Sequence, residues 1–269
     1  MTLPVPKYLQ AANVDDTSIR YQWDDWKTLP ALQAVDDKLK SRLKGVSQRA
    51  VVAFMCGTVE WIVHRFSRLC DDPALSAYLE AAWAMIVDVR YCVCGGGGTG
   101  WQEYSIKGWD GPIKAPIADA LERLEIAIQK LAWEDTDPVR RAGLLAALAA
   151  YVMTDPAPYK RWCGQVMKRF ESLYPRDPED ELGDVVPREA IDPKFDFKVE
   201  RTEALINRFL ASLDYHTNIF LTSPEDMLES DDEEEEGFKG TPYVFDMEAD
   251  REARRGGETE QEDEEDEDE

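Results

Sequence analysis

Apolar residues between positions 50 and 91 recur with the period of an α-helix, and this stretch organises the rest of the chain. At about 100° per residue, eight apolar side chains fall on a single arc: Val51, Val52, Met55, Val59, Ile62, Val63, Phe66 and Leu69. The opposite arc carries the polar and small residues: Gly57, Glu60, His64, Ser67 and Arg68. The pattern therefore predicts an amphipathic helix at the centre of the protein.

A second helix is predicted directly after Asp71-Asp72-Pro73, because a carboxylate before a proline is typical of a helix start. Its apolar positions continue to Val93, and its polar side consists of little more than Ser76, Glu80 and Asp88. We expect this helix to be buried on most sides.

The helical period returns in five further stretches, at residues 30–44, 116–131, 137–153, 159–173 and 197–215. No segment shows convincing strand alternation, and no repeat of about 20–50 residues is present. The sequence therefore predicts an all-α, single-domain bundle of about seven helices. We expect three regions, which are an irregular N-terminal arm at residues 1–29, the helical domain at residues 30–228 and a tail at residues 229–269.

The charge of the chain is concentrated in that tail. Of the net charge of −24, residues 229–269 contribute −17, with 21 acidic and 4 basic residues, and the remaining 228 residues contribute −7. Runs of like charge predict a disordered acidic tail. Because an acidic chain repels nucleic acids and anionic membranes, we expect a basic protein partner and no direct binding to nucleic acid or membrane.

The sequence shows no targeting or membrane signal. The N-terminus lacks the charged-then-apolar pattern of a signal peptide, and no apolar run approaches the about eighteen residues of a membrane span. These features predict a cytoplasmic protein. The five cysteines are expected to be reduced and to pack as small hydrophobes.

Residues 93–116 interrupt the helical period with a Gly-rich loop. Loops of this length inside a compact domain are uncommon and often functional. The glycines at 95–100 satisfy the letter of a dinucleotide-binding motif, but a helical pattern rather than a strand precedes them, so a flexible hinge is the better interpretation. We predict that the aromatic residues of the loop contact a partner: Trp101, Tyr104 and Trp109.

The tail contains an aromatic island at residues 237–246, between two acidic runs. The island either docks back on the body or serves as a short linear motif for another protein. The acidic runs could instead fold back on a basic strip of one helix: Lys160, Arg161, Lys168 and Arg169. We predict partner-binding residues in both the acidic run and the island: Asp231, Asp232, Glu233, Glu234, Phe238, Tyr243 and Phe245.

Candidate catalytic and metal-binding residues are sparse. Cys92 and Cys94 could supply two thiolates, but a closed zinc site needs about four ligands, and the two histidines, His64 and His216, lie elsewhere in the sequence. His64 lies one turn from Glu60, which could tune an acid–base histidine, although a solvated helix face explains the spacing as well. We therefore predict no catalytic residue, no metal ion and no cofactor.

These observations favour a non-enzymatic, acidic binding protein. Its sharpest form is an inhibitor or antidote of the immunity-protein type, which occludes a basic toxin or a nucleic-acid enzyme by presenting carboxylates where phosphates would lie. An acidic chaperone or adaptor for a basic client is the first alternative. An enzyme with a site between the Gly-rich loop and His64 is the second.

Overall fold

A computed structural model describes residues 5–24, 28, 32, 36–91, 100–105, 108–131, 138–222 and 244–255. Its elements are α1 (Lys7–Ala12), α3 (Asp37–Leu43), α4 (Gln48–Arg65), α5 (Pro73–Val87), η1 (Val89–Tyr91), α6 (Trp101–Tyr104), α7 (Gly111–Leu131), α8 (Val139–Val152), α9 (Ala157–Leu173), η2 (Arg188–Ile191) and α10 (Thr202–Leu210). Residues 247–255 form a further helix. The only β-structure in the described ranges consists of isolated bridges. The prediction of an all-α, single-domain fold is confirmed.

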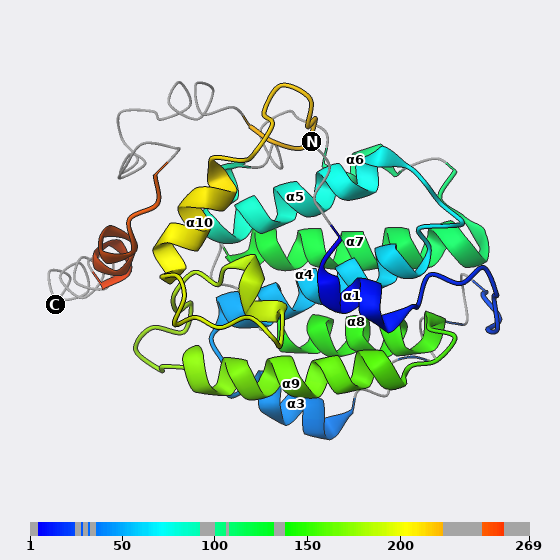
Figure 1. The fold of residues 1–269 in the computed structure, drawn as a ribbon, viewed down its shortest axis with the longest axis horizontal. Helices are drawn as coiled ribbons and strands as arrows, with labels where there is room; N and C mark the ends of the chain where they lie inside the picture. Colours follow the sequence, from blue (N-terminus) through cyan, green and yellow to red (C-terminus); the bar gives the residue numbers. More distant parts are fainter. Residues whose placement is uncertain are drawn as a thin grey trace, which may run out of the picture.

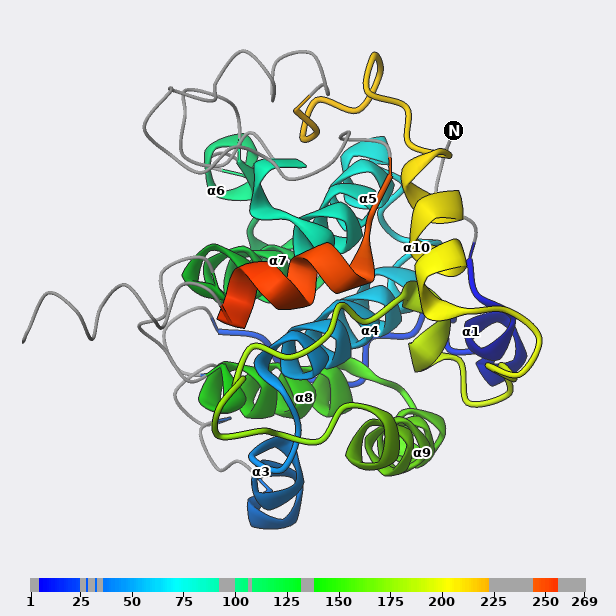
Figure 2. The same ribbon diagram turned by 90° about the vertical axis from the view of Figure 1, so that its left-hand side faces the viewer.

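Helix α4 lies at the centre of the bundle and is surrounded by other elements (Figures 1 and 2). Helices α5 and α7 pack on one side of α4, and α8 and α9 on the other. Most residues of α4 are buried, including Gly57 and Glu60 of the predicted polar arc. The prediction of an amphipathic α4 is therefore wrong along most of its length, while the prediction of a mostly buried α5 is confirmed.

Gly57 is buried because an aromatic ring lies directly against it. A Cβ atom at position 57 would stand 2.8 Å from Cζ2 of Trp162, closer than packed atoms allow. The indole of Trp162 stacks on Phe54 and Tyr8, and its Nε1 donates to the carbonyl of Ile191 at 2.9 Å. The glycine therefore provides a contact surface for α9, which its place among polar residues does not indicate.

Glu60 is buried because three elements supply partners for its carboxylate. Arg188 of η2 donates to Oε1 at 2.7 Å, Trp83 Nε1 of α5 donates to the same oxygen at 2.8 Å, and Tyr8 of α1 approaches Oε2 at 3.5 Å. Burial and the nearby Glu60 carboxylate raise the pKa of Tyr8 well above its ordinary value. A charge on the central helix is thus neutralised by a residue that is distant in the sequence.

Arg65, at the other end of α4, fixes the N-terminal arm. Its guanidinium is fully buried and donates to the carbonyls of Val152, Asp16 and Ser18. The arm also contains α1, so the prediction of an irregular segment at residues 1–29 requires correction at residues 7–12. Tyr21 and Trp23 of the arm pack against the hydrophobic core.

The region predicted as a Gly-rich loop is shorter than expected. Helix α7 begins at Gly111 and contains Pro116, which the helical period at residues 116–131 predicts at a helix start. Since proline has no amide hydrogen, the carbonyl of Pro112 loses its helical partner, and the hydroxyl of Tyr21 donates to that carbonyl instead. Residues 92–99 lie outside the described residues.

Three other predicted helices differ in extent from those of the structure. The predicted second helix ends at Val87 instead of Val93, and α10 covers only Thr202–Leu210 of the stretch 197–215. Of the stretch 30–44, the helix α3 covers Asp37–Leu43, and residues 30, 31 and 33–35 lie outside the described residues. Among the helices of the described residues, none combines the length and the apolar character needed to cross a bilayer.

The chain after α10 returns to α5 and closes the bundle. Asn218 donates to Glu80 Oε2 at 3.0 Å and to the carbonyl of Ala77 at 2.8 Å, and the amide of Thr222 donates to the carbonyl of Tyr91 at 2.9 Å. Phe220 is fully buried against Tyr78.

The Glu60–Arg188 pair generates a first prediction. Replacing Arg188 with Met should lower the free energy of unfolding by about 3–5 kcal/mol, because it leaves the Glu60 carboxylate buried without its counter-ion. Urea unfolding followed by circular dichroism measures this loss. The double variant Glu60→Gln/Arg188→Met, which removes both charges, should lose less than the single variant. A single variant as stable as the native chain would contradict the assignment.

Candidate functional site

The three aromatic residues predicted to bind a partner form one cluster, but one of them is inside the protein. Trp101 is fully buried, its amide donates to Glu125 Oε1 at 2.9 Å, and its indole Nε1 donates to the carbonyl of Ala118 at 3.3 Å. Its ring lies 4.9 Å from that of Trp109 and 5.5 Å from that of Tyr104. Trp101 is therefore unavailable to a partner in this conformation.

Tyr104 and Trp109 are partly exposed at the edge of this cluster. The hydroxyl of Tyr104 donates to Asp72 at 3.1 Å, and the Lys114 ammonium lies 5.3 Å from the ring centre of Trp109. Burial and the Asp72 carboxylate raise the pKa of Tyr104. Contact of these two residues with a partner stays a prediction.

His64 is half-buried near the N-terminal arm. Its Nδ1 atom is buried and has no hydrogen-bond partner within the described part of the chain. Burial lowers the pKa of His64, and the carboxylate of Asp15 opposes this effect. Glu60, which the sequence places one turn away, is engaged by Arg188 instead. The geometry therefore provides no carboxylate–histidine pair from these two residues.

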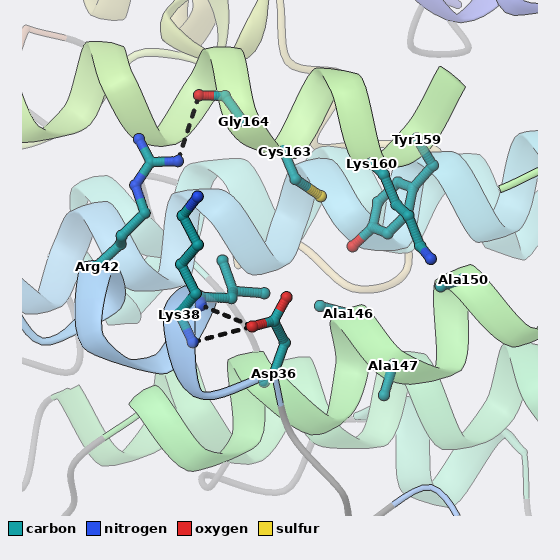
Figure 3. Close-up of a pocket in the computed structure, with 12 residues that line it drawn as sticks. Asp36, Lys38, Arg42, Ala146, Ala147, Ala150, Tyr159, Lys160, Cys163 and Gly164 are labelled. Carbon is teal, nitrogen blue, oxygen red and sulfur yellow. Dashed lines mark hydrogen bonds between the residues drawn. The ribbon is translucent and has the colours of Figure 1, made fainter. Parts of the chain in front are cut away.

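A cavity of about 390 Å³ lies between α3, α8 and α9 (Figure 3). Small residues of α8 form its floor, and Cys163 and Tyr159 face that floor from α9. Lys38 and Lys160 lie at its rim. The cavity is lined by Asp36, Lys38, Leu39, Arg42, Gly143, Ala146, Ala147, Ala150, Tyr159, Lys160, Cys163 and Gly164.

The thiol in this cavity is not poised as a nucleophile. Burial raises the pKa of Cys163 to about 12, against weaker opposing effects from Tyr159 and Arg42. The thiol is therefore protonated at neutral pH. Arg42 is itself engaged by Glu171, with Nε to Oε1 at 2.6 Å.

No group of three or more His, Cys, Asp or Glu side chains in the described ranges is arranged to hold a metal ion. Cys92 and Cys94 lie outside those ranges, as do six of the predicted partner-binding residues: Asp231, Asp232, Glu233, Glu234, Phe238 and Tyr243.

The described part of the tail, residues 244–255, docks on the body. The backbone amide of Phe245 donates to Asn207 Oδ1 at 2.5 Å, and Asn207 Nδ2 donates to the carbonyl of Phe245 at 2.9 Å. The Phe245 side chain packs against the hydrophobic core. For this part of the aromatic island, docking on the body is therefore the alternative that the structure supports.

An ion-pair network holds the helix at residues 247–255 beside the N-terminal end of α4 (Figure 2). Arg251 forms a two-point contact with Asp184, in which Nε lies 2.7 Å from Oδ1. Arg254 reaches Asp180 at 3.1 Å and Asp184 at 3.2 Å. The hydrogen bonds from Arg251 make the largest contribution to lowering the pKa of the Asp184 carboxyl, and Arg254 lowers it further.

Arg49 of α4 adds a cation to the same network. Its Nη1 and Nη2 atoms donate to Asp250 at 2.8 Å and 3.0 Å, and Asp250 also accepts from Arg254 within the tail helix. We call Arg49, Asp180, Asp184 and Asn207 the tail-docking site. Besides the Arg49–Asp250 pair, the site pairs body aspartates with tail arginines, which is the opposite polarity to the one expected from an acidic tail.

A tight loop positions the two aspartates of this site. Gly183 has a φ of +70°, and a Cβ atom there would stand 2.4 Å from Cβ of Ser47. Its amide donates to Asp180 Oδ1 at 3.0 Å. The first amides of α4, at Gln48 and Arg49, donate to loop carbonyls at 2.9 Å and 3.1 Å. The loop is therefore fixed to the start of the central helix.

The predicted basic strip on α9 is only partly available. Arg169 donates to the carbonyls of Ala190, Asp192, Pro193 and Phe195, so it anchors the segment around η2. Lys160, Arg161 and Lys168 are exposed. Because these carbonyls engage its guanidinium, Arg169 has to be removed from the predicted strip. The described part of the tail, residues 244–255, contacts the tail-docking site instead.

Sequence reasoning did not identify the tail-docking site. The available signal was the return of Arg251, Arg254 and Arg255 within an otherwise acidic tail, with Asp250 one turn before Arg254. Comparisons of the chain with protein-family models, with curated proteins and with solved structures find no match.

The state of Cys163 is testable by alkylation. With its pKa raised to about 12, the native thiol should react with iodoacetamide at pH 8 about a hundredfold more slowly, or slower still, than an unperturbed cysteine. Peptide mapping of native and urea-unfolded chain measures the two rates. Equal rates in the two states would contradict the assignment.

Docking of the tail helix is testable by hydrogen exchange. In the variant Arg251→Glu/Arg254→Glu, carboxylates face Asp180 and Asp184, so the amides of residues 247–255 should exchange about tenfold faster or more. The control Glu252→Gln alters an exposed residue of the same helix and should leave exchange unchanged. Unchanged exchange in the arginine variant would contradict the docking.

Proposed function

We propose that this chain is a stoichiometric binding protein for a basic protein partner. In its sharpest form it is an inhibitor or antidote that covers the working surface of a basic toxin or nucleic-acid enzyme. The cytoplasm is the compartment that we propose for it. The main support is the distribution of charge in the tail. Arginines of the tail pair with the tail-docking site, whereas most of the acidic residues of the tail lie before or after the docked segment in the sequence.

All three arginines of the tail lie in residues 244–255, and two of them pair with body aspartates. This docked segment holds four acidic and three basic residues. The flanking residues 229–243 hold seven acidic residues and one lysine, and residues 256–269 hold ten acidic and no basic residues. Two of the three tail arginines are thus paired with the body, and the flanking carboxylates carry almost unopposed negative charge.

Such charge suits recognition of a surface that normally binds phosphates. Closely spaced carboxylates attract a basic groove, speed association at low salt and exclude nucleic acid from it. Because the helix at 247–255 is docked beside α4, residues 256–269 start from a defined point on the body. A brush that only promotes solubility would need no such anchor.

The buried carboxylates support binding rather than catalysis as the role of the body. Glu60 is engaged by Arg188 and Trp83, Glu80 accepts from Asn218, and Glu125 accepts from the amide of Trp101. Each of these groups thus holds one element of the fold to another.

The proposal is tested by affinity purification of the tagged full chain from its native host. The matched variant replaces every Glu and Asp of residues 258–269 with Gln and Asn, which keeps the length and leaves residues 244–255 intact. The native chain should retain one basic partner at equal stoichiometry. The variant should retain less of this partner by about tenfold or more, and the native chain should show the same loss at high salt.

Two outcomes would contradict this function. Equal capture of the partner by the native chain and the amide variant would exclude the acidic residues at 258–269 as the binding element. Capture of many basic proteins at low stoichiometry would favour the chaperone or adaptor instead of the inhibitor.

A further inference from the structure

We propose that the tail-docking site recognises an arginine-bearing helix of the basic partner, and that residues 244–255 occupy the site as an internal substitute in the free protein. The proposal rests on the proposed function for the identity of the partner. The site itself is argued from four features of the described residues.

The first feature is that the tail helix is held mainly by charge. Val244 is 57 % exposed, and Phe245 is the residue of the segment that packs against the core. Its polar contacts are the hydrogen bonds of Asn207, a 3.5 Å contact of the Met247 amide with Glu203 Oε2, and the ion pairs of Arg251, Arg254 and Asp250. The Arg251–Asp184 pair is partly exposed on both sides. Pairs of this kind contribute little each and weaken with salt, so this part of the contact is replaceable.

The second feature is that the receiving side is formed independently of the tail. Asp180 is fixed by the amide of Gly183, and the carbonyls of Glu181 and Leu182 are held by the first amides of α4. The loop that carries the two aspartates follows α9, and Tyr174 at its start is buried. The loop that carries both carboxylates is therefore held to the body by contacts that do not involve the tail, which lowers the ordering cost of binding a second helix.

The third feature is a geometry that selects arginine. Asp184 accepts from two nitrogens of Arg251 and from Nη2 of Arg254, while Asp180 accepts from Nε of Arg254. A guanidinium matches such paired contacts with its planar fork, whereas a lysine offers a single point charge. The two aspartates thus form a receptor for two arginines.

The fourth feature is the Arg49 guanidinium, which favours an acidic residue beside the arginines of a bound helix. Arg49 contacts Asp250, which directly precedes Arg251 and lies one turn before Arg254. The helix that fits therefore carries an acidic residue at position i and arginines at positions i+1 and i+4. A cavity of about 270 Å³ beside Arg251 and Arg255 leaves room for larger side chains than those of the tail.

Occupation by the partner and by the tail helix is mutually exclusive, because both use the same carboxylates. Because the tail helix is part of the same chain, its effective concentration at the site is on the order of millimolar. An external helix must bind tightly enough to displace it at that concentration. The acidic residues beside the anchor favour the exchange by concentrating a basic partner near the site.

The probe for this proposal is a fluorescent peptide with the sequence of residues 244–255, titrated against full-length chains by anisotropy. In Arg251→Glu/Arg254→Glu the internal helix is weakened and the receiving side is intact, so the peptide should bind about tenfold more tightly, or more, than to the native chain. Adding Asp180→Asn/Asp184→Asn should remove this gain. Circular dichroism verifies that each variant is folded.

Arginine selectivity has its own control. A peptide in which lysine replaces the arginines at positions 251 and 254 keeps the charge and should bind about tenfold more weakly or worse. The proposal is overturned by equal affinity for the native chain and the Glu variant, by binding that survives the Asn substitutions, by equal binding of the lysine peptide, or by no binding at all. Since no natural partner takes part in this experiment, its failure leaves the affinity-purification result standing, and the reverse also holds.

Discussion

The structure depends on one constraint, which is that α4 is surrounded by protein and still carries polar side chains. A buried charge or hydrogen-bonding group without a partner is costly, so each of these groups requires a partner from another segment. Glu60 obtains one from η2, Arg65 from the N-terminal arm, and Arg49 from the tail. The hydroxyl of Thr58 lies 3.3 Å from that of Tyr159 on α9. The polar groups of the central helix thus fix the segments around it.

The docked tail follows from the same requirement. Arg49 is 8 % exposed and donates both to the carbonyl of Gly183 and to Asp250. The loop that carries Asp180 and Asp184 accepts hydrogen bonds from the amides of the same turn of α4, so a single helix end orders both sides of the contact. In this way the centre of the fold is coupled to the part of the chain that we propose for partner recognition.

Sequence patterns predicted the helices well where apolar burial alone decides their position. Helices α4, α5, α8 and α9 follow the apolar period, because packing of such stripes needs no particular partner. Prediction failed where a distant residue decides the outcome. Glu60 looks solvent-facing until Arg188, 128 residues away, is placed beside it. Pro116 looks like a helix start until Tyr21 satisfies the freed carbonyl.

The candidate site was harder to predict for the same reason. The aromatic side chain of Trp101 gives no indication that Phe220 and Tyr78 lie against it in the interior. The acidic composition of the tail concealed its arginines, which determine where residues 244–255 lie. Composition reports the sum of the charges, whereas docking depends on which charges the body neutralises.

Hydrogen exchange of full-length Arg49→Met and Arg65→Met, followed segment by segment, tests most directly whether the polar groups of α4 hold the surrounding segments individually. The account predicts that loss of Arg49 speeds exchange in residues 247–255 and leaves the N-terminal arm unchanged. Loss of Arg65 should do the reverse, with residues 14–24 exchanging faster and the tail helix unaffected. Uniform acceleration in both variants, or none in either, would contradict it.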